Sequence, residues 1–404
     1  MFINKSILKY YLFQAATFPG FIIPINVLYL IYHDLSFTEI ALASIVTEVI
    51  VFISEIPTGY ISDNIGRRNA LVLSVSLYTI VRAAFVFASS FYVFVVLFGI
   101  LGIAGTLQSG SVDAWLYETL DEQERAGDFT EVRGRGSAIR LWFGAVMMIL
   151  GAILYTFQPE YPYIAATIIS AVGILVLITL PKNAQYVREQ TNEENLTTVK
   201  AFSAIYNQLS TPHLRYFVIY IGLFFAIAYS VNEYTQPVTV EALDLILKSS
   251  FQLIRDTSEE ILLGGIFALF SIATAFASEF ASNIEDFFGQ RRVFFAIPVI
   301  ASGIIVLSNF VSSLIISVFF VTRLSNSIIK PISARYINDR IKSFGRATVL
   351  SAVALVYAAI RIPFLLIGGR LADVRGPVFS IFILGFVFLA ITIPSYVVYF
   401  YIGD

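Results

Sequence analysis

The chain has 404 residues, of which 57% are hydrophobic and 13% are charged, and its mean hydropathy is +0.80. Soluble domains carry about 25% charged residues, so this composition excludes an ordinary soluble protein and indicates an integral membrane protein. The net charge of −2 gives no indication of a nucleic-acid partner, and the lack of cysteine excludes disulfides and thiolate metal sites.

Apolar runs long enough to cross a bilayer recur along the whole chain. A transmembrane helix needs about 20 mostly apolar residues, and the unbroken runs 69–114 and 292–333 are each about twice that length. We divide each of them and take the N-terminal run as a first span, because it is too long for a signal peptide. The twelve predicted spans are 8–32, 37–59, 69–89, 92–114, 138–157, 162–181, 214–235, 260–281, 292–309, 312–333, 347–368 and 377–401.

Lys and Arg gather in the segments that these spans place on the same side as the N-terminus. The segments on the other side hold only Lys248, Arg255, Arg370 and Arg375. Because positively charged loops stay in the cytoplasm, we expect a multi-pass protein of the cell membrane with both termini cytoplasmic.

The longest polar segment follows the sixth span and divides the chain into halves. The sequence thus predicts an N-terminal six-helix bundle over 1–181, a cytoplasmic linker over 182–213 and a C-terminal six-helix bundle over 214–404. The end of the linker, VKAFSAIYNQLS, has apolar residues at roughly helical spacing. An amphipathic helix on the membrane surface and a plain solvated linker are equal alternatives there.

A charged stretch after the second span, EIPTGYISDNIGRR (55–68), returns in weaker form as SEFASNIEDFFGQRR (278–292) after the second span of the other half. A further echo follows the fourth span of each half, where SVDAWLYETL (111–120) resembles PISARYINDR (331–340). Their shared order predicts a duplicated six-helix unit.

The segment GYISDNIGRR resembles the loop between helices 2 and 3 of the major facilitator superfamily: Gly, three residues, Asp, two residues, Gly, then basic residues. EIPTG and SGSVDAWLYETL further resemble an uncharacterised or drug-exporter-like prokaryotic branch. The resemblance covers essentially the whole chain. It implies an all-α membrane protein of twelve helices in two pseudo-symmetric six-helix bundles. The second-half copy has Ser282 at the first glycine position, so we do not extend the loop's function to it.

The resemblance implies that this loop is a conformational latch. Gly59 and Gly66 would permit close helix contact and a turn with unusual backbone angles. Asp63 would face the start of helix 11, near Gly345 to Thr348, where the helix dipole attracts an anion. A loop that only satisfies the positive-inside rule is the simpler alternative.

The basic end of the loop, Arg67 and Arg68, would pair with an acid on helix 4. The candidates for that acid are Asp113 and Glu118. Such a pairing would hold one conformational state and release in the other.

The charged residues within predicted spans include Glu48, Glu55, Arg82, Arg323 and Arg361. Each costs at least about 2.5–3.5 kcal/mol to insert and usually faces a cavity or a partner. On the helix order that the resemblance implies, Glu48, Arg323 and Arg361 reach a central cavity. We expect Arg82 to be structural and to pair with Glu48, which lies at a similar depth.

Desolvation inside the bilayer favours the protonated form of a carboxyl group, whereas a nearby arginine favours the ionised form. A group that alternates between these surroundings can carry a proton, and Glu48, Glu55 and Asp113 are the candidates. A permanently paired structural acid is an equal alternative for Glu48 and the stronger one for Glu55.

Polar and aromatic side chains on the expected cavity helices would complete a substrate site. The candidates are Gln14, Asn26, Gln108, Tyr229, Asn232, Gln236, Arg323, Asn326 and Arg361.

The leading hypothesis is a secondary active transporter that moves a small organic solute by alternating access, with proton antiport and export favoured. A facilitative uniporter, an organic-anion transporter and a non-transporting sensor or scaffold are the alternatives. His33 and His213 lie near opposite faces, and the sequence has neither a phosphate-binding glycine loop nor a nucleophile with its base. We therefore expect no enzyme, no cofactor and no metal. The expected protein is a monomer in the lipid bilayer that binds a small-molecule substrate and protons.

Overall fold

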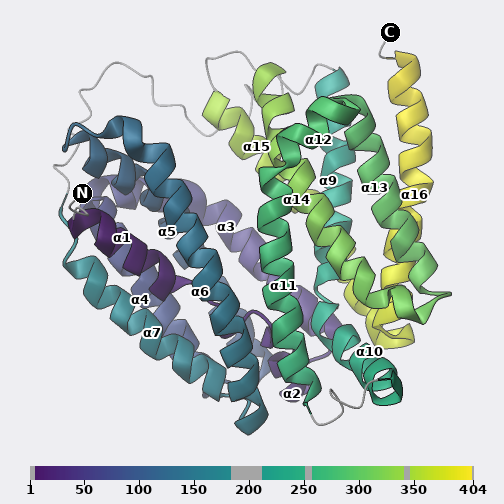
Figure 1. Cartoon of the computed structure of the whole chain (residues 1–404), viewed down its shortest axis with the longest axis horizontal. Helices are drawn as coiled ribbons and strands as arrows, with labels where there is room; N and C mark the ends of the chain where they lie inside the picture. The colour runs from purple at the N-terminus through teal and green to yellow at the C-terminus, as the bar shows by residue number, and fades with distance from the viewer. Residues whose placement is uncertain (1–4, 183–211, 251–256, 341–345, 403–404) are drawn as a thin grey trace. The chain divides into compact units, whose positions relative to one another are not determined.

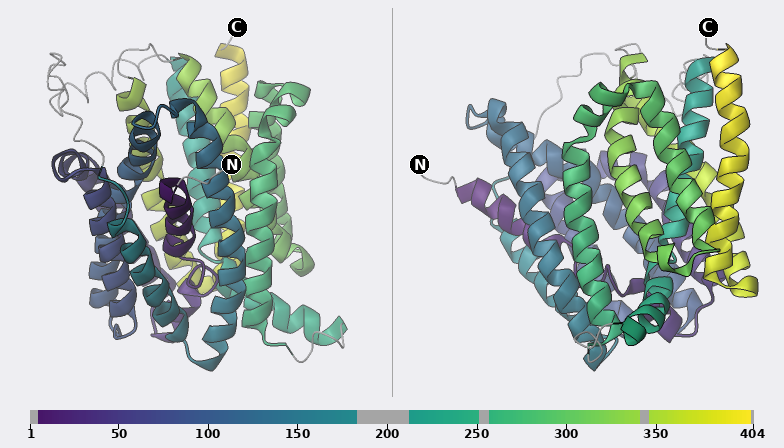
Figure 2. Two further views of the ribbon diagram at one scale, coloured as in Figure 1. Left: turned by 60° about the vertical axis from the view of Figure 1, so that its left-hand side comes forward. Right: turned by 45° about the vertical axis from the view of Figure 1, so that its right-hand side comes forward.

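The computed structural model describes residues 5–182, 212–250, 257–340 and 346–402, and these residues form helices without any strand (Figure 1, Figure 2). The helices of the first half are α1 (Lys5–Thr17), α2 (Asn26–Tyr32), α3 (Phe37–Ile65), α4 (Arg67–Phe85), α5 (Phe91–Asp121), α6 (Phe129–Phe157) and α7 (Tyr161–Ile178). The second half holds α9 (Pro212–Asn232), α10 (Thr235–Ser250), α11 (Glu259–Glu279), α12 (Ala281–Phe288), α13 (Gln290–Ser308), α14 (Ile315–Arg340), α15 (Arg346–Arg375) and α16 (Pro377–Ile402).

Every predicted span after the first coincides with one long helix. Within the described residues, nine helices are long and apolar enough to cross a membrane, and α16 adds a shorter apolar stretch, Pro377–Thr392. The helix α4 begins with Arg67 and Arg68 and contains Arg82, which lowers its mean hydropathy. Helix lengths and composition thus agree with a chain that crosses the bilayer many times.

The span predicted over 8–32 is not one unbroken helix, because α1 ends at Thr17 and α2 begins only at Asn26. Pro19, Gly20 and Pro24 lie between them, and proline cannot donate the hydrogen bond that an α-helix needs. The carbonyl of Pro19 instead accepts turn bonds from the Ile22 and Ile23 amides, at 3.0 and 3.1 Å.

The unwound segment between α1 and α2 lies against α6. A Cβ atom at Gly144 would overlap the Phe18 ring, and one at Gly151 would overlap the backbone of Phe21. Irregular backbone at membrane depth is tolerated only where protein covers it or water reaches it. The two glycines let α6 supply that cover.

The contacts group the described residues into two compact units. Unit 1 comprises 5–35, 42–182 and 257–272, and unit 2 comprises 36–41, 212–250, 273–340 and 346–402. The start of α3 therefore groups with unit 2, and most of α11 groups with unit 1. The predicted linker lies almost wholly outside the described residues, so its amphipathic helix and the domain boundaries at 181 and 214 stay predictions.

The two halves repeat one packing plan. In unit 1, α1 packs on α6 and α7, while α4 packs on α5 and α7. In unit 2, α9 packs on α15 and α16, while α13 packs on α14 and α16. Counted by spans, the first helix of each half meets the fifth and sixth, and the third meets the fourth and sixth. This is the repetition that the predicted duplication requires.

Candidate functional site

The loop between α3 and α4 consists of Gly66 alone. Its φ of 84° is a conformation that residues with a side chain rarely adopt, so the turn requires glycine for its backbone and not for space. Gly59 lies inside α3, and a Cβ there would meet no described atom within 4 Å. The expectation of close helix contact at Gly59 is therefore wrong within the described residues.

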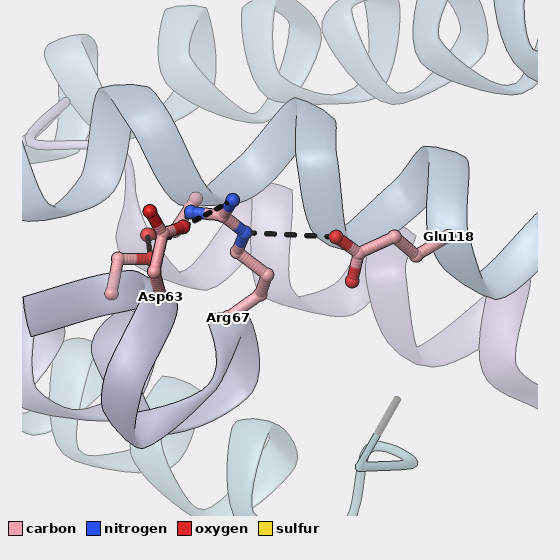
Figure 3. A network of polar contacts seen from close by, with 5 residues as sticks. Asp63, Arg67 and Glu118 are labelled. Atoms are coloured by element: carbon pink, nitrogen blue, oxygen red, sulfur yellow. Dashed lines mark hydrogen bonds and ion pairs between the residues drawn. The ribbon is translucent and has the colours of Figure 1, made fainter. Parts of the chain in front are cut away.

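Arg67 is the centre of the polar network in Figure 3. Its guanidinium lies 2.6 Å from Asp63, 3.6 Å from Glu118 and 3.0 Å from the Ser62 hydroxyl, which in turn lies 2.8 Å from the Ser111 hydroxyl. Arg67 thus joins the end of α3, the start of α4 and the last turns of α5. Of the two predicted acids on helix 4, Glu118 is the one that pairs with it.

The other two residues assigned to the latch have different partners. Arg68 donates to the carbonyls of Ile178 and Leu180, at 3.3 and 3.2 Å, and so satisfies acceptors at the end of α7. Asp113 accepts from Arg133 of α6 at 2.8 Å. The predicted pairing of Arg68 with an acid on helix 4 is wrong, and Asp113 lies outside the network around Arg67.

The contact expected between Asp63 and the start of helix 11 stays a prediction. Gly345 lies outside the described residues, and α15 begins at Arg346 with side chains that are not described before Val353.

Arg82 is 6% exposed and turns toward α1 and α7. It donates to the Ser170 hydroxyl and, at 3.3 Å, to the Thr17 carbonyl at the end of α1, and it lies 5.5 Å from the centre of the Tyr78 ring. The predicted pair with Glu48 is therefore wrong. Glu48 is half-buried on α3, and Glu55 is exposed on the same helix.

In the first half, two of the cavity candidates have partners within unit 1. The Gln14 amide donates to the Tyr10 hydroxyl, and the Asn26 oxygen accepts from the Tyr163 hydroxyl, both at 2.9 Å. Gln108 is half-buried on α5.

In the second half, the candidates lie on α9, α14 and α15, which contact one another, and Gln236 lies on α10. The Arg361 guanidinium lies 4.2 Å from the centre of the Tyr229 ring, which is a cation–π contact. The Asn232 amide donates to the Ala228 carbonyl at 2.7 Å, and Gln236 is 7% exposed.

Two further residues belong to the same place. Glu233, the residue after the end of α9, acts electrostatically on the buried Arg323 guanidinium of α14. The Tyr357 ring of α15 packs edge-on against Phe225 of α9 at 5.4 Å. The hydroxyl of Tyr357 and the amide oxygen of Asn326 are buried and have no hydrogen-bond partner among the described residues.

We call these residues the unit 2 polar cluster: Tyr229, Asn232, Glu233, Arg323, Asn326, Tyr357 and Arg361. Sequence reasoning missed Glu233 and Tyr357. Tyr357 precedes Arg361 by one helical turn, and that i,i+4 spacing is the signal that would have found it.

The model of the Major Facilitator Superfamily matches residues 11–254, which is more than half of the chain. The chain belongs to the major facilitator superfamily.

Two superfamily relatives are similar to it over part of their length. An uncharacterized MFS-type transporter of Methanocaldococcus jannaschii is 26% identical over 129 residues, 30% of this chain and 30% of the relative. One of Bacillus subtilis, YqjV, is 28% identical over 144 residues, 36% of this chain and 34% of the relative. The chain thus spans about a third of the length of these curated relatives.

Solved superfamily structures match the fold over nearly the full chain. The nucleoside transporter NupG has a TM-score of 0.79 at 10% identity and is covered completely by 99% of this chain. A bacterial homolog of the lysosomal transporter Spinster has a TM-score of 0.70 at 14% identity, over 97% of this chain and 95% of its own. At such identities the likeness supports the fold alone, which agrees with the twelve-helix superfamily architecture predicted from the sequence.

Proposed function

We propose that this chain is a secondary active transporter that moves a small organic solute across the cell membrane by alternating access. The observation that carries the proposal is the unit 2 polar cluster. It places Arg323, Arg361 and Glu233 on membrane-spanning helices or at their ends. Charged groups inside a membrane are costly and mark substrate or ion pathways. Gln14, Asn26 and Gln108 are the proposed substrate-cavity residues of the first half.

We further propose proton coupling, with antiport and export as the direction. Glu48 is the first candidate for the proton carrier, because it is a half-buried carboxylate on a spanning helix. Asp113 is paired with Arg133 at 2.8 Å, so its carboxylate has a cation beside it. Glu55 is exposed and is the weakest of the three.

An organic anion is the second candidate substrate. The Arg361 guanidinium of α15, stacked on Tyr229, and the Arg323 guanidinium of the preceding helix α14 bring two positive charges to the cluster, against the single carboxylate of Glu233. A ligand carboxylate would match the excess positive charge.

Proton coupling is tested in proteoliposomes that contain a trapped pH-sensitive dye. Nucleosides, sugars, amino acids, organic anions and lipophilic cations are each added under an imposed proton gradient. We expect at least one class to move protons together with solute, and Glu48→Gln to reduce the proton movement at least tenfold while solute still binds. Glu131→Gln is the matched control, because Glu131 is an exposed acid in an i,i+4 surface pair with Arg135. Solute flux that ignores the gradient would remove proton coupling from the proposal.

The network around Arg67 is proposed to hold the cytoplasmic side of the transporter in one state, as the latch. Nitroxide labels at Asp121→Cys and Ala334→Cys lie on the last turns of α5 and α14. Pulsed electron paramagnetic resonance measures the distance between the two labels and so reports the state of the cytoplasmic side. We expect Asp63→Asn and Glu118→Gln each to shift the balance of the two distances about two- to fivefold, the range for partly exposed ion pairs. One unchanging distance in every variant would favour the scaffold alternative instead.

A further inference from the structure

Unit 1 holds a second arginine within a spanning helix besides Arg82, namely Arg140 of α6. Its side chain is exposed, whereas Gly136 and Gly144, one turn before it and one turn after it, are buried. Residues four apart lie on the same face of a helix. The face of α6 that carries Arg140 is therefore covered by protein on both sides of the arginine.

Two rings of the first span cover this face. A Cβ atom at Gly136 would lie 2.6 Å from the Tyr10 ring, and one at Gly144 would overlap the Phe18 ring. The Arg140 guanidinium itself lies 5.0 Å from the centre of the Phe18 ring. Arg140 is thus directed at the unwound segment that follows α1.

The lipid side of α6 lies elsewhere on the helix. Trp142 and Val146 are exposed apolar residues, and at 100° per residue they lie about 160° and 120° away from Arg140. The exposed part of Arg140 therefore opens on the protein side of α6 and not into lipid.

Arg140 has aromatic neighbours and no acidic partner. Tyr10 and Tyr78 act on it electrostatically, and Phe18 stacks on it. Among the described residues, no carboxylate forms an ion pair with its guanidinium. The ring of Tyr78 also lies 5.5 Å from the Arg82 guanidinium, so a second positive charge adjoins the same tyrosine.

Other arginines of unit 1 show the contrast. Arg67 lies 2.6 Å from Asp63, and Arg133 lies 2.8 Å from Asp113. Arg140 is instead an accessible cation whose described neighbours supply no counter-charge. A charge in a membrane is costly without a partner, and such residues mark ligand or ion pathways.

We propose that Tyr10, Phe18, Tyr78 and Arg140, which we call the Arg140 site, bind the oxyanion of a small organic solute. The guanidinium has the planar fork that matches a carboxylate or phosphate group, and the rings provide an apolar wall for the rest of the solute. This inference rests on the proposed function, whose substrate it assigns to the organic anions.

The arginine reagent phenylglyoxal tests the site on the natural chain in phosphatidylcholine nanodiscs, with mass spectrometry of each modified arginine. We expect millimolar benzoate and phenyl phosphate to slow the modification of Arg140 about tenfold, the effect of a charge-assisted hydrogen bond. Benzyl alcohol, which has the same ring without the charge, should not slow it. Arg135 is the control within the same helix, because its guanidinium pairs with Glu131 on the surface. Equal protection by benzyl alcohol, or no protection by either anion, would overturn the proposal.

Substitutions test whether the guanidinium binds the anion. Arg140→Gln should weaken benzoate binding, measured by calorimetry, about ten- to a hundredfold. Arg140→Lys keeps the charge but loses the fork and the stacking on Phe18, so its loss should be intermediate. Arg135→Gln should bind benzoate like the natural chain. The melting temperature without benzoate shows that each variant is folded. A folded Arg140→Gln protein with natural affinity would place the anion elsewhere, such as at the unit 2 polar cluster, and refute the Arg140 site.

A lipid headgroup offers the same chemistry, and a change of lipid separates the two sources. In nanodiscs of phosphatidylglycerol without any soluble anion, Arg140 should be modified as fast as in phosphatidylcholine. Protection by phosphatidylglycerol alone would assign the oxyanion to a lipid and contradict the solute site. None of these readouts uses transport. Solute flux without protection of Arg140 would refute the site alone, and protection without flux of any solute would refute the transporter proposal alone.

Discussion

Gly151→Val is expected to remove nearly all folded protein. A Cβ atom at this position would overlap the carbonyl, Cα and carbon atoms of Phe21, and a backbone in the unwound segment between α1 and α2 cannot rotate away as a side chain can. Overpacking in a core lowers stability by about 1–3 kcal/mol. Because the backbone must shift here, we expect the loss of stability in this variant to lie at or above the upper end of that range. The melting temperature and the monodisperse yield in detergent measure the loss.

Gly134→Val is the control for that substitution. Gly134 lies on the same helix, α6, and a Cβ there would meet no described atom within 4 Å. Both substitutions replace a helical glycine by the same β-branched residue, so the gain in helix propensity is the same. If the two variants melted together, the close approach of α6 to the unwound segment would be unimportant for stability.

Arg82→Met is expected to lower the free energy of unfolding by about 2 kcal/mol. Ser170 keeps its bond to the Ala166 carbonyl at 2.6 Å, but the Thr17 carbonyl at the end of α1 loses the donor that satisfies it. A buried acceptor left without a partner costs about 1–3 kcal/mol. The removal of a buried guanidinium relieves desolvation, which is why the expected loss is not larger.

Thermal unfolding in detergent measures this cost, with Arg135→Met as the control. The Arg135 guanidinium pairs with Glu131 on the surface, where an ion pair contributes about 0–1 kcal/mol. Arg82→Lys keeps the charge but loses the forked geometry, so it should fall between the natural chain and Arg82→Met. A natural-like melting temperature for Arg82→Met would mean that water satisfies Thr17.

The spans could be predicted because bilayer thickness fixes the length of an apolar run, whatever its side chains pack against. The break in the first span was missed because mean hydropathy ignores backbone. The mean hydropathy of the run is lowered only a little by Pro19, Gly20 and Pro24. The prolines nevertheless interrupt the backbone hydrogen bonds of the helix, because they have no amide hydrogen to donate. The position of this break mattered for the site, since it separates Gln14 from Asn26.

The partners of charged side chains were harder to predict than their depth. Asp113 and Glu118 both lie near the inner end of helix 4, yet five residues place them about 140° apart around the helix. Only Glu118 faces Arg67, and Asp113 faces α6 instead. Arg82 and Glu48 were matched by depth, but depth does not determine which side of a helix a residue occupies.

Asp373 was missed although its spacing to two glycines repeats that of Asp63. The two matching loops, 55–68 and 278–292, follow the second span of each half, whereas this copy follows the fifth span of its half. The long-range bonds from the Phe37 and Thr38 amides show that Asp373 caps the start of α3. A search for the spacing itself, without regard to position, would have found it.

The helix α3 is 29 residues long, and 25 residues separate Thr38 from Asp63. At 1.5 Å per residue these two residues are about 37 Å apart along the helix. A tilt of about 5° about one end displaces the other by about 3 Å, which is as far as a hydrogen bond reaches. A small rotation of α3 about one end therefore moves a residue at the other end by about one hydrogen-bond length, and Pro57, which lies inside α3, is the position at which the helix can bend.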